Sequence, residues 1–155
     1  MSKYWAKNFA GIHQNDMEML TIRRSGIELA IHVTFKTVEV GTVMGTIGGA
    51  LLQAIQGPGH KLEDYKQAAL SGGYKGLLFG LAAGPVLTLL RTSSLSYPQV
   101  YDRCYRLRFN THQLNVDRCT ALGGLLGVGL GGPAGAVIGV DAGVAVGNFL
   151  NLFVK

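Results

Sequence analysis

The sequence predicts an all-α membrane protein whose four transmembrane helices pack on one another through rows of glycine. Three observations predict this fold class. Only 15% of the 155 residues are charged, against roughly 25% in soluble domains. Residues 40–55 and 76–90 contain no Asp, Glu, Lys or Arg, and such apolar runs approach the length that crosses a bilayer. Glycine occurs 23 times, about twice the usual share of roughly 7%.

The N-terminal residues 1–36 are predicted to be a polar or interfacial region, with a short helix near residues 15–24. Ser25 and Glu28 have the spacing of a capping box, in which each side chain bonds the other residue's backbone N–H. The helix that begins there is expected to continue to about residue 56, with its membrane part at about 37–56. Gly-Pro-Gly at 57–59 then ends it, and a loop follows up to Tyr65.

The second span is predicted at about residues 67–91, and an interfacial helix follows it. Aromatic residues in that helix recur every fourth position, and arginines flank them. The stripe fits a helix lying in the membrane interface, or one packed against the end of the bundle, and both interpretations stay open. The arginines are predicted to bind anionic lipid head groups such as cardiolipin, with plain interfacial anchoring as the alternative. The aromatic residues are Tyr97, Tyr101, Tyr105 and Phe109, and the arginines are Arg103, Arg106 and Arg108.

The third and fourth spans are predicted at about residues 116–130 and 134–153. Gly131-Gly132-Pro133 separates them and has the composition of a tight turn that opens a new helix. One long helix through residues 119–153 is the competing interpretation, and the Gly-Gly-Pro sequence argues against it.

Glycines four residues apart form three rows, and this spacing places each row on one face of its helix. Lipid tails are as apolar as leucine, so exclusion of water cannot hold membrane helices together. Close backbone contact can do so, and small residues permit it. The rows therefore predict tight helix packing. They are Gly41, Gly45 and Gly49; Gly72, Gly76, Gly80 and Gly84; and Gly123, Gly127, Gly135, Gly139, Gly143 and Gly147.

Two ionisable residues lie at similar predicted depth, each about two turns inside its span. An intramembrane ion pair between Lys75 and Asp141 is the expectation, because either charge alone costs about 2.5–3.5 kcal/mol at the bilayer centre. A polar path through the bundle and a Lys75 side chain that reaches the membrane surface are the alternatives. Glu39 is expected to meet Arg118 or solvent.

No catalytic, cofactor or metal site is predicted. Cys104 and Cys119 lack metal-ligand spacing, and a disulfide between them is left open. Residues 127–132 match GxGxxG, but Pro133 follows directly and no strand precedes them, so nucleotide binding is not expected. The net charge of +5 is assigned to the membrane flanks rather than to a nucleic-acid surface. Neither an enzymatic activity nor a small-molecule substrate is expected.

Residues 37–153 resemble the mitochondrial inner-membrane import translocase superfamily, which includes a four-helix accessory subunit of respiratory complex I. The resemblance consists of four spans, the glycine rows, and Asp117-Arg118 leading into the glycine-rich segment 123–127. Gln113 stands where the superfamily has an arginine, and the glycine pair follows at slightly different spacing.

The resemblance implies a multi-pass protein of the mitochondrial inner membrane. A non-catalytic structural or accessory subunit, most simply of respiratory complex I, is the first expectation. A component of a protein-import translocase is the alternative. The expected partners are other membrane subunits and lipid. The superfamily places both termini in the intermembrane space, whereas the excess of basic residues on the terminal side favours the opposite orientation.

Overall fold

The computed structural model describes residues 3–56 and 61–153, which form helices and connecting turns only. Three helices are long and apolar enough to cross a membrane: α3, α4 and α6. The predicted Gly-Pro-Gly stop lies outside the described residues, and the loop after it ends earlier than predicted, because α4 begins at Leu62. The elements are α1 (Lys3–Phe9), α2 (Asp16–Leu20), α3 (Ser25–Gln56), α4 (Leu62–Thr92), α5 (Tyr97–Phe109) and α6 (Thr111–Asn151).

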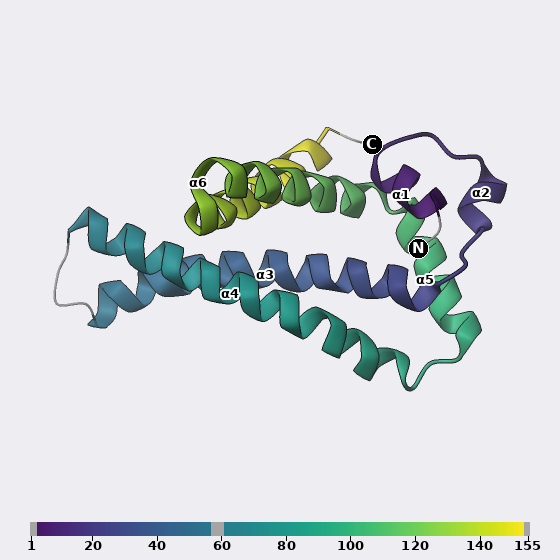
Figure 1. Ribbon diagram of the computed structural model, residues 1–155, viewed down its shortest axis with the longest axis horizontal. Coiled ribbons are helices and arrows are strands. Elements are labelled where there is room, and N and C mark those ends of the chain that lie inside the picture. Colours follow the sequence, from purple (N-terminus) through teal and green to yellow (C-terminus); the bar gives the residue numbers. More distant parts are fainter. Residues whose placement is uncertain (1–2, 57–60, 154–155) are drawn as a thin grey trace.

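The long helices form two antiparallel hairpins (Figure 1): α3 with α4, and the two halves of α6 with each other. α3 and α4 run side by side, and α6 lies along α3 on another side. The short helices α1, α2 and α5 gather at the end where α3 begins and α4 finishes. We call these three short helices the cap.

α3 and α4 meet at their glycines, so that backbone lies against backbone. An ideal Cβ placed on Gly76 would lie 1.9 Å from the carbonyl oxygen of Gly41, and one on Gly45 would lie 2.3 Å from that of Gly72. The hydroxyl of Thr37 also donates across the interface to the Gly80 carbonyl at 2.7 Å. No residue with a side chain fits at these contacts unless the backbone shifts. The other glycines of these two rows also lie against the facing helix: Gly49 contacts Ala68, Gly80 contacts Thr37 and Val38, and Gly84 contacts Thr34.

α6 is a hairpin, as the Gly-Gly-Pro sequence predicts. Gly131 and Gly132 have non-helical dihedral angles, and φ of +57° at Gly132 is a left-handed conformation that favours glycine. We call residues 111–130 the first arm and residues 133–151 the second arm. The arms meet through Gly123 with Gly139, Gly127 with Gly135, Gly143 with Cys119 and Thr120, and Gly147 with Val116.

The open end of the α6 hairpin is closed by side-chain hydrogen bonds. Asn151 donates to the carbonyl of His112 at 2.8 Å, and Asn115 donates to the side-chain oxygen of Asn151 at 3.2 Å. The first arm begins at Thr111, about one turn before the span predicted from residue 116.

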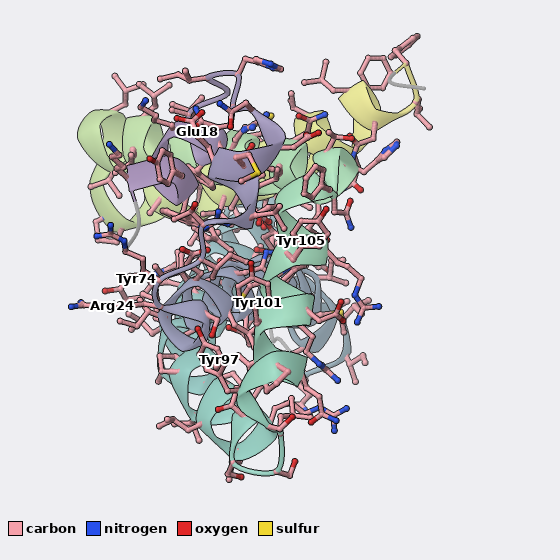
Figure 2. All side chains as sticks on the ribbon, turned by 90° about the vertical axis from the view of Figure 1, so that its right-hand side faces the viewer. Glu18, Arg24, Tyr74, Tyr97, Tyr101 and Tyr105 are labelled. Atoms are coloured by element: carbon pink, nitrogen blue, oxygen red, sulfur yellow. The ribbon has the colours of Figure 1, made fainter. Side chains whose placement is uncertain are left out.

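The aromatic stripe of α5 is partly an internal contact. Tyr101 and Tyr105 pack against a core formed by α3, α5 and the segment before α3, whereas Tyr97 and Phe109 are exposed. The Tyr101 hydroxyl donates to the carbonyl of Leu20, which ties α5 to α2. Figure 2 shows the tyrosines following one another along α5. The middle of the stripe therefore packs on the protein, as one of the two interpretations proposed. The buried core residues are Ile22, Leu29, Val100 and Cys104.

The capping box predicted at Ser25 is wrong. Asn15 and Glu18 instead form such a box at the start of α2, where the Glu18 N–H donates to Asn15 Oδ1 at 2.8 Å. The Glu28 carboxylate bonds Arg108 rather than the backbone at Ser25. A bidentate, charge-assisted pair is stronger than a neutral cap bond, and this explains the difference.

Candidate functional site

Three polar side chains bond the carboxylate of Asp117 where α3 crosses the first arm of α6. One Asp117 oxygen lies 3.0 Å from His32 Nδ1, and the other lies 3.0 Å from Lys36 Nζ. Gln113 Nε2 donates to that second oxygen, also at 3.0 Å. Lys36 additionally pairs with Glu39, one turn further along α3. Asp117 is 2% exposed and Glu39 is 5% exposed. We call these five residues the charge network.

The charge network links α3 to the first arm of α6. Within it, one lysine pairs with two carboxylates, those of Asp117 and Glu39. Glu39 Oε1 has no hydrogen-bond partner among the described residues. The expectation that Glu39 meets Arg118 or solvent is wrong. Arg118 Nε instead donates to the Phe9 carbonyl at 2.8 Å, which fastens α1 to α6.

The predicted ion pair between Lys75 and Asp141 is absent. The Asp141 carboxylate accepts a hydrogen bond from Thr46 at 2.7 Å, whereas the Lys75 side chain is exposed. The reason lies in the rotation of α4 about its axis. Gly73 is the residue that α4 presents to Thr46 and Val137, and a side chain two positions further on does not share that face. Similar depth therefore did not bring the two charges together.

We predict that Thr46→Val destabilises the protein, because it leaves the Asp141 oxygen without its donor. The expected loss is about 1–3 kcal/mol of unfolding free energy, measured by circular dichroism during titration with a denaturing detergent. Lys75→Gln is the matched comparison and is expected to change stability by no more than about 0.5 kcal/mol. If Lys75→Gln costs as much as Thr46→Val, the interaction assigned to Asp141 is incorrect.

Arg108 does not face lipid, which corrects one of the three predicted head-group contacts. Its side chain is 2% exposed, and its Nη2 lies 2.7 Å from Glu28 Oε1. Its other nitrogen atoms donate to Glu28 Oε2 at 3.0 Å and to the Met19 carbonyl at 2.8 Å. The arginine therefore joins α5, α3 and α2 inside the cap. Position in a basic stretch could not reveal this, because Arg103 and Arg106 lie in the same stretch.

Arg106 and Arg103 differ from Arg108 in exposure. Arg106 is exposed and pairs with Asp102 at 2.6 Å, and Arg103 is half-buried. These two stay candidates for lipid head groups. The residues described contain no group of three or more His, Cys, Asp or Glu side chains placed to hold a metal ion.

The disulfide left open between Cys104 and Cys119 is not formed, and both thiols are free. Burial, together with the nearby Glu28 carboxylate, raises the pKa of Cys104 from 9.0 to about 11. The Cys104 sulfur also bonds the Ser25 carbonyl at 2.9 Å. Because the thiolate is the reactive species, this cysteine is expected to be inert in the folded protein.

We predict that iodoacetamide at pH 8 alkylates Cys104 about a hundredfold more slowly in the folded protein than after unfolding in SDS, because the pKa is about two units higher. Peptide mass spectrometry measures both rates. The same shift has a pH consequence. Above pH 9 the unfolded chain loses a proton that the folded chain keeps up to about pH 11, so stability falls as pH rises through that window. Equal alkylation rates in the two states would contradict this assignment.

An open apolar groove of about 800 Å³ lies where α3, α4 and α6 diverge. Small side chains spaced four apart line it on α3, and the charge network lies outside it. Sequence reasoning missed this groove, although the spacing of its small residues was visible. Its walls include Gly26, Ala30, Thr34 and Val38 of α3, Leu81, Pro85 and Thr88 of α4, and Thr120, Ala121, Gly124 and Val140 of α6. We call this feature the apolar groove.

The family described as "Protein of unknown function (DUF1757)" matches residues 5–150. The chain belongs to that family. No curated protein matches it. The DUF1757 match includes the cap as well as the long helices, so the cap and the two hairpins fall within the same family unit.

The sequence of this DUF1757 protein contains a spacing pattern that indicates part of the charge network. His32, Lys36 and Glu39 lie four and three residues apart, so they share one face of α3. A row of ionisable residues on one face of a membrane helix indicates a polar contact with another helix. The sequence did not indicate that Asp117 supplies this contact.

Proposed function

We propose that this DUF1757 protein is a non-catalytic subunit of a multi-subunit complex in the mitochondrial inner membrane, most simply respiratory complex I. In this proposal the chain crosses the membrane four times: through α3, α4 and both arms of α6. The arms measure about 30 Å and 28 Å at 1.5 Å per residue, close to the thickness of the hydrocarbon core. The glycine contacts of the two hairpins would hold these four spans together in lipid.

The observation that carries the proposal is a set of exposed apolar side chains on α2 and on the segment before it, outside the spanning helices. Met17 is 74% exposed, Ile12 is 55% exposed and Leu20 is 43% exposed. Large apolar side chains left exposed outside the hydrocarbon region indicate a protein contact or the membrane interface. Arg108 bonds the Met19 carbonyl of α2 and Arg118 bonds the Phe9 carbonyl of α1, so these side chains are held on a fixed support.

Native electrophoresis after mild detergent extraction tests the proposal. We expect the tagged chain to migrate with respiratory complex I, and Met17→Glu to release it. Glu63→Gln is the control, because it changes an exposed residue on the far side of the molecule. Met44 is unsuitable for this purpose, since it lies in the predicted lipid region. Wild-type protein that migrates alone would contradict the proposal.

A protein-import role is the second candidate, and one observation favours it. Glu39 Oε1 and Asp141 Oδ1 are buried carboxylate oxygens without a partner among the described residues. A cavity of about 520 Å³ adjoins Glu39, and its lining combines polar residues such as Asn148, apolar residues such as Val43, and Lys36. A basic segment in transit could bond the free Glu39 oxygen there, beside the Lys36 ammonium that pairs with the other oxygen. Migration with import machinery rather than with complex I would favour this role.

A further inference from the structure

The apolar groove has one charged end. Arg24 lines it where α3 begins, and the guanidinium of Arg24 makes no hydrogen bond or ion pair within the described part of the chain. The side chain extends away from the ribbons (Figure 2). Two threonines further inside bond carbonyls of their own helices, with Thr34 donating to Ala30 at 2.7 Å and Thr88 to Gly84 at 2.9 Å. The Thr34 and Thr88 hydroxyls are thereby satisfied, and Thr92 likewise donates to the Thr88 carbonyl at 2.8 Å. The buried Thr120 hydroxyl has no hydrogen-bond partner among the described residues. The other walls beyond Arg24 are apolar.

The length of the groove matches one leaflet of a bilayer. Along α3 its lining runs from Arg24 to Val38, which is about 21 Å at 1.5 Å per residue. Half of a bilayer with its head groups measures about 20–22 Å. Deeper in the molecule, Gly73 of α4 meets Val137 of α6, and this contact closes the gap between those helices. A helix spanning the membrane would need about 30 Å, so the groove is too short for one along its whole length.

We propose that the apolar groove binds an anionic phospholipid, with the lipid phosphate on Arg24 and an acyl chain between the two hairpins. The phosphate accepts hydrogen bonds from the free guanidinium, an arrangement that suits arginine. The small side chains of Ala30 and Ala121 leave room for the methylene chain. The site is separate from the basic stretch of α5. It goes beyond the proposed function, because it depends on neither the partner nor the organelle.

Lipid exchange tests the site in the full-length protein. Purified protein is equilibrated with mixed vesicles containing equal amounts of phosphatidylglycerol and phosphatidylcholine, re-extracted in mild detergent and analysed by native mass spectrometry. We expect the wild type to retain phosphatidylglycerol preferentially. Arg24→Gln should lower that preference about fivefold, the effect of one basic residue at a membrane surface. Arg23→Gln is the matched control, since Arg23 is also exposed but does not line the groove, and it should retain the preference.

Filling the groove tests the acyl chain separately from the charge. Ala121→Phe should reduce the total amount of bound phospholipid, and Ala30→Leu should do so as well if the first variant fails to fold. Equal retention of both lipids by the wild type would overturn the proposal, and so would equal losses in Arg23→Gln and Arg24→Gln. A photoreactive side chain at position 121 gives a third readout in native membranes. Crosslinks to lipid support the proposal, whereas crosslinks to a polypeptide would show that a partner helix fills the groove.

Discussion

Replacing Gly76 with alanine is expected to lower the unfolding free energy by about 1–3 kcal/mol, the usual cost of overpacking a filled interior. The added methyl group would lie 1.9 Å from the carbonyl oxygen of Gly41, and that atom belongs to backbone rather than to a flexible side chain. α3 and α4 must therefore move apart, and other glycine contacts along the same interface would weaken with them. Titration with a denaturing detergent, followed by circular dichroism, measures the effect.

Gly48→Ala provides the control for this experiment. An ideal Cβ on Gly48 has no other atom within 4 Å, apart from its chain neighbours and its own helix backbone. Alanine is also the better helix former by roughly 1 kcal/mol in water. The stability of this variant should stay the same or rise. Equal destabilisation by both substitutions would mean that the glycines act through helix propensity and not through contact between α3 and α4.

Replacing Arg108 with methionine is expected to cost about 3–5 kcal/mol, because it leaves the Glu28 carboxylate buried without its partner. The two side chains are 2% and 3% exposed, so water cannot replace the lost bonds. The Met19 carbonyl also loses its donor. We expect α2 to separate from α5, which limited proteolysis between α2 and α3 would detect together with the loss of stability.

Arg106→Met is the matched comparison for Arg108→Met. It removes an arginine from the same helix, but its pair with Asp102 is exposed at 2.6 Å, and exposed pairs contribute about 0–1 kcal/mol. If the two variants lose similar stability, the bond between Glu28 and Arg108 does not hold the cap in place. Combining Arg108→Met with Glu28→Met should recover part of the loss, since no unpaired charge is then buried.

The helical elements could be predicted from the sequence because their signals are local. Residue spacing fixed the glycine faces, and Gly131-Gly132-Pro133 marked the turn that makes α6 a hairpin. Both depend on a few neighbouring residues, and the structure is all-helical, with non-helical dihedral angles at Gly131 and Gly132. The aromatic stripe of α5 was also visible, but its spacing could not distinguish lipid from protein as the surroundings of Tyr101.

Charged contacts were predicted poorly because they depend on rotation and distance between helices. Lys75 and Asp141 were matched by depth alone, yet Asp141 meets Thr46 and Lys75 is exposed. Arg103, Arg106 and Arg108 look alike in sequence, and only the last is buried. A shift of one or two positions turns a side chain to another face of its helix. The sequence alone does not give the rotation of a helix about its axis relative to the neighbouring helix.

The sequence by itself determined that the chain is helical and apolar, and which residues share a helix face, because periodicity is a property of each helix alone. Only the tertiary structure decided which face meets which. It placed Gly41 against Gly76, Asp117 against His32 and Lys36, and Glu28 against Arg108. It also opened the apolar groove at Arg24, since a groove exists only where packed helices diverge. Such pairings join residues far apart in the chain, and no local pattern records them.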